Sequence, residues 1–170
     1  FDEACSVILP VLSALGEAHA RDVIHRDLSP ENIMITSEFP EVELKVLDFG
    51  LARIMTTSQF TKITHAMGKV GYASPEQIRE PQKVDAQSDI YSTGVVLYEL
   101  LTGDIPLGSF QSPSDVVEGF STVLDKIVEK SLKQKQNLRY MSTSEFSSDL
   151  DLSLRDWQKE RVFGWLENFR

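Results

Sequence analysis

One segment of the sequence, residues 89–101, is apolar on nearly every side of a helix. Its apolar residues leave no broad polar face on the helix. These residues are Ile90, Tyr91, Val95, Val96, Leu97, Tyr98, Leu100 and Leu101. A helix that is hydrophobic all round lies inside a core rather than on its surface. Ser88 before it is the expected N-cap, and Gly103 after it is a residue type that ends helices. We therefore expect this helix in the middle of the core.

Further helices are predicted on both sides of this segment. Residues 7–18 carry apolar side chains at helical spacing, with Pro10 as a point where the helix can kink. Residues 123–132 form an amphipathic helix, and Ser142 with Glu145 has the pattern of a capping box that begins another. The apolar face of that helix consists of Phe146, Leu150 and Leu154. The alternation in its middle also fits a strand, but the cap favours the helix.

Strands and loops occupy a smaller share of the chain. Two short strands are predicted at residues 32–35 and 42–47, because the second alternates apolar and polar residues before becoming apolar. Residues 52–71 are rich in Thr, Ser and Lys and are expected to form a long loop, which in compact domains usually has a function. The tail of the chain has one helical stripe, expected to pack on its own lobe and made of Trp157, Val162, Trp165, Leu166 and Phe169. The predicted fold class is mainly α (α+β).

Composition restricts the function of such a fold. The chain has 170 residues, with 17 Lys and Arg against 26 Asp and Glu, and a formal net charge of −9. This acidity, without a run of Lys and Arg, argues against nucleic acid or an anionic membrane as the main partner. The single cysteine, Cys5, excludes an internal disulfide and a thiolate zinc site. No apolar run is long enough to span a membrane, so we expect a cytoplasmic domain, whose parent protein can still carry an anchor elsewhere.

The residues with the clearest chemical meaning lie at 25–32 and 48–50. The first segment reads His-Arg-Asp-Leu-Ser-Pro-Glu-Asn, and the second, Asp-Phe-Gly, begins 16 residues after Asn32. Asp27, Asn32 and Asp48 offer the hard oxygen ligands that Mg²⁺ prefers, usually together with phosphate oxygens. A carboxylate among them can instead take a proton from an attacking hydroxyl. The pattern therefore indicates phosphoryl transfer.

These motifs resemble, in order, those of the C-terminal lobe of a Ser/Thr protein kinase, close to the bacterial members with eukaryotic-type folds. The patterns H-R-D-x-x-x-x-N and D-F-G are complete, and residues 71–76 are similar to the A-P-E region, with Ser74 at the Ala position. Residues 88–103 resemble the buried central helix of the family. Arg139 lies where the family has an Arg that pairs with the A-P-E Glu, which is Glu76 here. The resemblance implies a protein-kinase-like fold, in which short strands of a helical lobe carry the catalytic and metal loops.

The resemblance also implies the cofactors, ATP and Mg²⁺, and a protein substrate with a Ser or Thr hydroxyl, which Pro30-Glu31 favours. Asp27 would accept the hydroxyl proton, while Asn32 and Asp48 would hold the Mg²⁺ ions at the phosphates of ATP. Met34 would lie under the adenine. Arg26 would pair with a phosphate on the activation loop, for which Thr56, Thr57, Ser58, Thr61 and Thr64 are candidates.

Four further residues would have structural roles. Asp89 would accept hydrogen bonds from the backbone of residues 25–32, the catalytic loop of the family pattern. Glu76 and Arg139 would form an ion pair. His25, although part of the H-R-D pattern, is expected to pack rather than to catalyse.

The sequence departs from the family pattern at two functional positions. The usual Lys two residues after the catalytic Asp is Ser29, and the usual Thr after the Gly that precedes A-P-E is Lys69, which follows Gly68. We hypothesise that the Lys69 ammonium reaches the γ-phosphate and replaces the missing cation. The alternative is that Lys69 faces solvent and turnover is weak.

The resemblance also bears on what surrounds this lobe. The connection between residues 103 and 123 is short and contains Pro106 and Pro113, so the helix usually found there is expected to be reduced or absent. No Gly-rich phosphate loop and no V-A-I-K Lys occur in these residues, so the N-terminal lobe is expected to be missing and the fragment inactive by itself. We assign residues 1–154 to the C-terminal lobe and 155–170 to a helical extension. A pseudokinase or partner-binding scaffold, and a small-molecule phosphotransferase of related fold, remain as alternatives.

Overall fold

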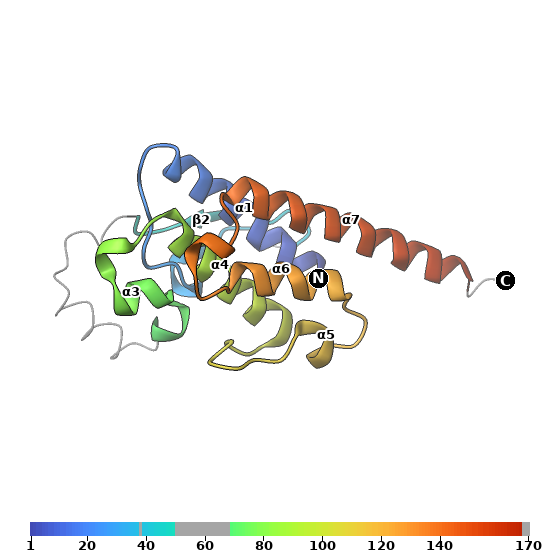
Figure 1. Ribbon diagram of the computed structural model, residues 1–170. Helices are drawn as coiled ribbons and strands as arrows, with labels where there is room; N and C mark the ends of the chain where they lie inside the picture. The colour runs from blue at the N-terminus through green and yellow to red at the C-terminus, as the bar shows by residue number, and fades with distance from the viewer. Residues whose placement is uncertain (38, 50–68, 168–170) are drawn as a thin grey trace.

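The computed structural model describes residues 1–37, 39–49 and 69–167 (Figure 1). Side chains of Lys69 and of residues 162–167 lie outside this description. In chain order the elements are α1 (Asp2–His19), η1 (Pro30–Asn32), β1 (Ile33–Ile35), β2 (Leu44–Val46), η3 (Lys69–Tyr72), α3 (Pro75–Arg79), η4 (Pro81–Lys83), α4 (Ala86–Thr102), α5 (Pro113–Val116), α6 (Thr122–Ser131), η5 (Gln136–Leu138) and α7 (Thr143–Glu167). None of the described helices combines the length and apolar character that a membrane crossing requires.

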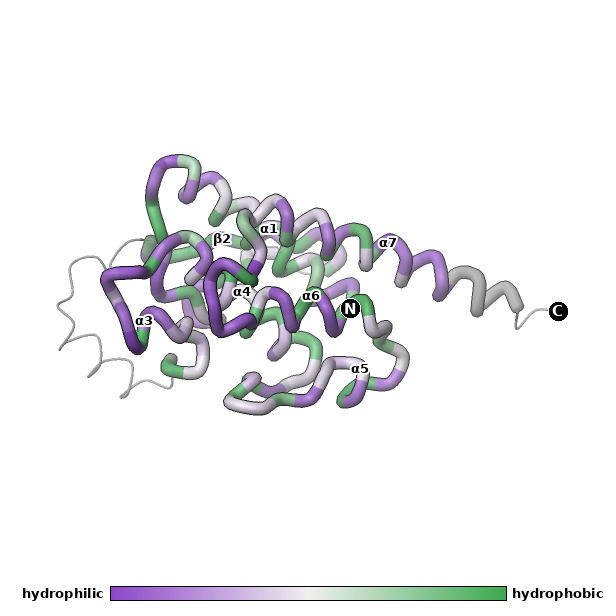
Figure 2. Tube along the Cα trace, in the orientation of Figure 1, coloured by the Kyte–Doolittle hydropathy of each residue, from purple (hydrophilic) through white to green (hydrophobic). Residues whose placement is uncertain are grey.

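Helix α4 lies at the centre of the hydrophobic core, as its sequence predicts. Its buried apolar residues pack with those of α1, α6 and α7 in one cluster. Figure 2 shows hydrophobic stretches of α1 and α4 in the interior, whereas α3 is largely hydrophilic. The helix begins at the N-cap Asp85, whose side chain accepts the N–H of Gln87 at 2.9 Å. It ends at Gly103, which adopts the left-handed conformation with φ 82°.

The α4–α6 contact is unusually close because Gly94 has no side chain. A Cβ atom at this position would lie 2.2 Å from Ser131 Oγ and 2.7 Å from Ser131 Cβ. Ser131 belongs to α6, and its hydroxyl donates to the carbonyl of Val128 at 2.7 Å. The glycine therefore determines how near the two helices approach each other.

Helices α1 and α7 pack side by side across one flank of the core (Figure 1). The turn of α7 around Trp157 reaches the beginning of the chain, where the indole packs edge-to-face on Phe1 and Phe120 with centroids 6.0 and 5.8 Å apart. One residue further on, Asp2 accepts hydrogen bonds from Gln158 at 2.9 Å and from Arg161 at 2.8 Å. These contacts join α7 to the first turn of α1.

The two strands form an antiparallel pair in which Met34 lies opposite Lys45. A small second core lies below them, formed by Val11, Leu15 and Leu28 with the partly buried Leu44 and Val46. Both strands were predicted, and each is shorter than its apolar pattern. This pair matters for the site because β1 directly follows residues 25–32, and β2 leads to Asp48.

Several sequence-based expectations need correction. Asp85, not Ser88, caps α4, because Ser88 is buried and its hydroxyl donates to Glu76. Leu100, expected in the core, is 46% exposed, and Val123, which begins the predicted amphipathic helix, is 53% exposed. Residues 69–71, expected as loop, belong to η3.

Other expectations are confirmed. Residues 150–154 are helical rather than extended. At Pro10, where an interruption was expected, α1 instead continues as one element. The connection after α4 holds only the four-residue helix α5, so the helix expected to be reduced is short.

Candidate active site

Asp89, on the central helix, anchors the loop that carries the predicted catalytic residues. Its carboxylate accepts the backbone N–H of His25 and that of Arg26, each at 2.9 Å. His19 Nε2, at the end of α1, lies 2.8 Å from the same carboxylate. Asp89 is 1% exposed, and hydrogen bonds to a charged group are strong when water is excluded. The expected role of Asp89 is confirmed.

His25 connects this loop to the residues that follow β2. Its Nε2 lies 2.7 Å from the carbonyl oxygen of Leu47. Its Nδ1 accepts a hydrogen bond from the backbone N–H of Asp27 at 3.2 Å. A neutral imidazole with its proton on Nε2 satisfies both contacts. The buried ring packs edge-to-face on Phe49, with centroids 4.8 Å apart. His25 therefore holds the loop in place, as expected.

Asp27 and Asn32 lie together at the end of the loop. The amide nitrogen of Asn32 donates to the backbone oxygen of Asp27 at 2.6 Å and to its carboxylate Oδ2 at 3.1 Å. The backbone carbonyl of Asn32 accepts the N–H of Leu47 at 2.8 Å, and Asp48 follows directly. The structure thus brings two of the three predicted polar residues into contact and connects the third through one backbone hydrogen bond.

Two residues of the site adopt the left-handed backbone conformation. The φ angle is 69° at Arg26 and 60° at Asp48. For residues other than glycine this conformation costs about 1 kcal/mol or more, so surrounding contacts must maintain it. At Arg26 the N–H is bound by Asp89, and the carbonyl accepts the side-chain amide of Gln77 at 2.5 Å. Asp48 is exposed, so its carboxylate is accessible to a ligand.

Three other residues singled out by the sequence are Met34, Ser29 and Lys69. Met34, on β1, is 44% exposed. Ser29 is 1% exposed, and its hydroxyl makes no hydrogen bond within the described part of the chain. Lys69 begins η3, but its side chain is outside the described residues. The predicted phosphorylation sites on the activation loop also lie outside the described residues.

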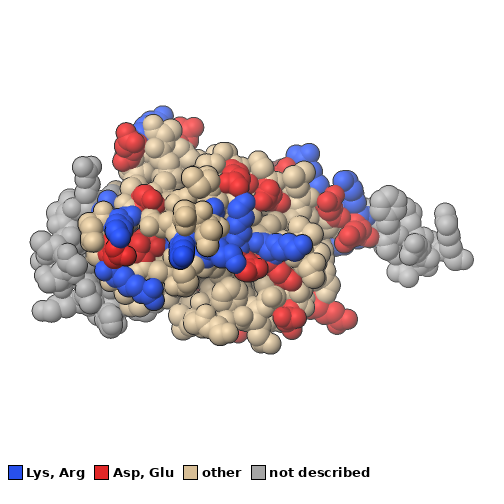
Figure 3. Space-filling model, viewed as in Figure 1, with Lys and Arg blue, Asp and Glu red and all other residues tan. Residues whose placement is uncertain are grey.

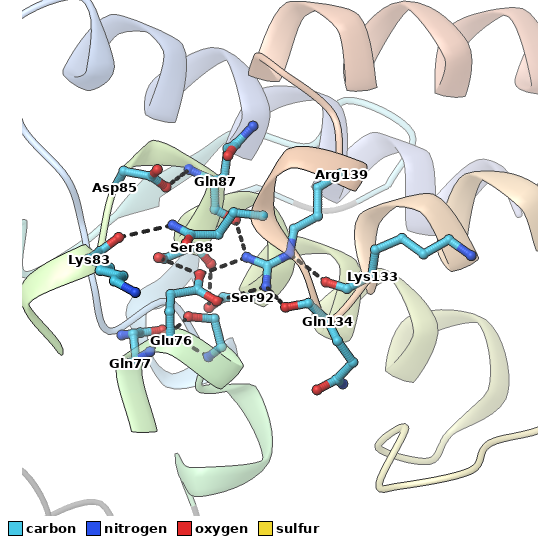
Figure 4. A network of polar contacts seen from close by, with 12 residues as sticks. Glu76, Gln77, Lys83, Asp85, Gln87, Ser88, Ser92, Lys133, Gln134 and Arg139 are labelled. Atoms are coloured by element: carbon cyan, nitrogen blue, oxygen red, sulfur yellow. Dashed lines mark hydrogen bonds and ion pairs between the residues drawn. The ribbon is translucent and has the colours of Figure 1, made fainter. Parts of the chain in front are cut away.

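A buried ion pair joins α3 to the segment before α7 (Figure 4). Arg139 binds both carboxylate oxygens of Glu76, at 2.7 and 2.8 Å, and Ser88 donates to one of them at 2.7 Å. The remaining guanidinium donors bind the carbonyls of Lys133, Gln87 and Gln134. Burial raises the pKa of Glu76, but the hydrogen bonds from Arg139 and Ser88 outweigh it and hold the pKa below its ordinary value. The expected ion pair is confirmed.

With this geometry established, comparison with known proteins identifies the family. Residues 2–161 match the protein kinase domain. The chain belongs to the protein kinase family. The serine/threonine-protein kinase PknB of Mycobacterium tuberculosis is 38% identical over 164 residues, which are 86% of this chain and 25% of that protein. The probable serine/threonine-protein kinase PknB of Bifidobacterium longum is 39% identical over 161 residues, which are 85% of this chain and 23% of that protein.

Solved structures agree on the kinase fold. The PknI kinase domain of Mycobacterium tuberculosis superposes with a TM-score of 0.68 and 24% sequence identity, covering 89% of this chain and 55% of that domain. The chain therefore spans about a quarter of the PknB relatives and about half of a solved kinase domain. The expected protein-kinase-like, mainly helical fold is confirmed.

Two residues of the candidate site were not anticipated. Gln77 reaches the carbonyl of Arg26, and His19 contacts Asp89. Gln77 could have been found, because Ser74-Pro-Glu-Gln77 has the capping-box pattern and the structure forms both halves of that box. No sequence signal marks His19, since its partner is 70 residues away.

The donor set of the site is compatible with Mg²⁺ on a nucleotide. Among the described residues no three His, Cys, Asp or Glu side chains form a metal-binding group. A cation held by Asp48 and Asn32 would therefore need oxygen ligands from phosphate and water, which is how Mg²⁺ is usually bound. Since the amide nitrogen of Asn32 is engaged by Asp27, the amide oxygen is the atom it can offer.

Proposed function

We propose that this chain carries the catalytic and metal loops of a Ser/Thr protein kinase that transfers the γ-phosphoryl group of ATP to protein hydroxyls. The observation that carries the proposal is the hydrogen bond from Asn32 to the carboxylate of Asp27, in a loop fixed by the buried Asp89. Such a bond orients the Asp27 carboxylate, so that it can take the proton of an incoming hydroxyl. Membership of the kinase family and the PknB relatives support the same assignment.

Asn32 and Asp48 would hold Mg²⁺ against the phosphates of ATP. Bound there, the cation would neutralise charge on the phosphates that are transferred and released. The exposed Asp48 contributes the carboxylate, and the Asn32 amide contributes a neutral oxygen. Met34 would contact the adenine with its exposed side chain, and Arg26 would bind a phosphate on the activation loop.

In addition to Mg²⁺, the ammonium group of Lys69 would assist the transfer of the γ-phosphoryl group. Ser29, at the usual Lys position, is buried and too short to reach a phosphate as an ammonium would. In the natural protein that contains this chain, Lys69→Ala should lower kcat by about a hundredfold, as loss of a preorganised donor does. A near-normal rate would disprove this role.

We further propose that residues 1–154 are the C-terminal lobe and that residues 155–170 extend it. The chain covers about half of the PknI kinase domain, and the motifs that it contains are those of that lobe. The fragment would then need an N-terminal lobe to clamp ATP and would show little activity alone. The kinase domain would act in the cytoplasm.

The test of the proposed function uses the natural protein, γ-labelled ATP and a mixture of Ser- and Thr-containing peptides. We expect Mg²⁺-dependent labelling that falls at least a hundredfold in Asp27→Asn. A thermal shift with Mg²⁺ and ATP should be lost in Asp48→Asn, which tolerates the left-handed backbone, and retained in the exposed control Asp104→Asn.

A non-catalytic pseudokinase is the second candidate, favoured by one observation, the buried Ser29 at the position of the usual Lys. It predicts no labelling by the natural protein, with or without the Asp27 substitution. Nucleotide binding without labelling would therefore favour the scaffold over the enzyme.

A further inference from the structure

An open groove of about 520 Å³ lies between α3, η4 and η5, apart from the catalytic loop. Apart from Pro75, its lining residues are all charged or carry an amide: Glu76, Arg79, Glu80, Lys83, Gln134, Lys135, Gln136 and Asn137. These residues come from separate stretches of sequence, which is why no basic run marks them. Figure 3 shows Lys and Arg gathered in a band across the middle of this face of an otherwise acidic chain.

The charges of the groove do not cancel. Glu76 in its wall is neutralised by Arg139, and Glu80 forms an ion pair with Lys83 (Figure 4 shows Glu76, Lys83 and Arg139). Arg79 and Lys135 are exposed, and neither has an ion-pair partner within the described residues. The groove therefore presents two uncompensated cations, in a chain with a net charge of −9.

The amide side chains favour an extended peptide as the anion. Gln134 and Asn137 are exposed at the groove, and each offers both a donor and an acceptor. Such groups can bind the N–H and C=O of a peptide backbone, while the cations bind its carboxylates. A nucleic acid fits less well, because a longer polyanion would meet the negative charge of the rest of the chain.

Helix α3 connects the groove to the catalytic loop. Glu76 and Arg79 face the groove, whereas Gln77, between them, donates to the carbonyl of Arg26, next to Asp27. The diameter of a helix with its side chains is about 10 Å. A protein that places one segment in the groove can therefore present another segment to the catalytic loop.

We propose that this groove docks an acidic segment of the protein substrate, away from the hydroxyl that is phosphorylated. That the docked protein is a substrate rests on the proposed kinase function, whereas the docking itself needs no catalysis. Its partner is defined by chemistry: a peptide rich in Asp or Glu, in extended conformation.

The test measures binding without ATP. A fluorescein-labelled peptide of alternating Glu and Gly, about ten residues long, is titrated with the chain at about 50 mM salt, where screening is weak. The double variant Arg79→Glu/Lys135→Glu should weaken binding at least about tenfold, because each attraction becomes a repulsion. The matched control, Lys126→Glu/Lys159→Glu, makes the same change in net charge at exposed positions outside the groove and should stay within about twofold.

Two further arms make the result decisive. The peptide with Gln in place of Glu should not bind. Arg79→Gln/Lys135→Gln, which adds no negative charge, should weaken peptide binding to an intermediate extent. This variant replaces the Glu variant in the comparison if the Glu variant unfolds. Equal weakening in the groove and control variants, or tighter binding of a single-stranded oligonucleotide of equal charge, would overturn the proposal. Kinase failure is separable, because a protein that binds the peptide but labels nothing refutes the catalytic proposal alone.

Discussion

At the scale of single residues, two buried carboxylates hold separate parts of the molecule together. The carboxylate of Asp89 accepts hydrogen bonds from the backbone of His25 and Arg26. The carboxylate of Glu76 accepts hydrogen bonds from the guanidinium of Arg139 and the hydroxyl of Ser88. Both carboxylates are buried, and each fixes a segment beside the candidate site. A buried charge of this kind is tolerated only while all its partners are present.

Removing the partner of Glu76 should therefore be costly. Arg139→Leu leaves the buried carboxylate unpaired and also frees three backbone carbonyls, so we expect a loss of about 3–5 kcal/mol in the free energy of unfolding. Arg155→Leu, which removes an exposed ion pair with Asp151, should change it by less than about 1 kcal/mol. Urea denaturation of both variants makes the comparison. If Glu76→Leu/Arg139→Leu lost the full sum of the two single losses, the proposed coupling would be absent.

The same pair gives the chain a defined acid sensitivity. The pKa of Glu76 in the folded state lies below its ordinary value of 4.5, so the folded state binds fewer protons than the unfolded state. The stabilisation is therefore complete above pH 4.5 and is lost as the pH falls through the folded-state pKa. Denaturation curves of the wild type and Glu76→Gln should converge as the pH is lowered from about 7 towards 3. A constant difference across that range would contradict this assignment.

At the scale of elements, the fold depends on how closely helices approach α4. The helices could be predicted from the sequence because the spacing of apolar residues is local information. The end of α4 at Gly103 could be predicted for the same reason. Ser88 was assigned wrongly as the cap because its true partner, Glu76, is 12 residues away and invisible to local patterns. For the same reason the H-R-D and D-F-G motifs predict candidate site residues, but not the contacts of His19 with Asp89 and of Gln77 with Arg26.

Gly94 is the position where this packing can be tested. Gly94→Ala would place a methyl group 2.2 Å from Ser131 Oγ, so α4 and α6 must separate, at a cost of about 1–3 kcal/mol. Leu100→Ala on the exposed side of the same helix should cost less than about 1 kcal/mol. Thermal unfolding of the two variants provides the measurement. Combining Gly94→Ala with Ser131→Gly should recover part of the loss, and no recovery would mean that Ser131 does not cause the clash.

At the scale of the whole molecule, α7 ties the end of the described chain to its beginning. Trp157, Gln158 and Arg161 contact Phe1 and Asp2, although they lie beyond the boundary we placed at residue 154. The match to the kinase domain also extends to residue 161. These contacts indicate that at least one turn of the proposed extension contributes to the stability of the lobe.

We expect Trp157→Ala to lower the free energy of unfolding by about 2–4 kcal/mol, because it removes the ring that packs between Phe1 and Phe120. Lys159→Ala, two residues along, removes only an exposed ion pair and should be nearly neutral. Chemical denaturation distinguishes the two. Equal stability of the Trp157 variant and the wild type would show that the extension is dispensable.

The left-handed conformations of Arg26 and Asp48 have a consequence for engineering. A glycine would adopt the same backbone angles without steric strain, so both positions offer a gain in stability to any selection based on heat resistance alone. The same exchange would delete the side chain proposed to bind a phosphate and the carboxylate proposed to bind Mg²⁺. Directed evolution of this chain for thermostability should therefore include a functional screen, or it will favour catalytically silent glycine variants at these two positions.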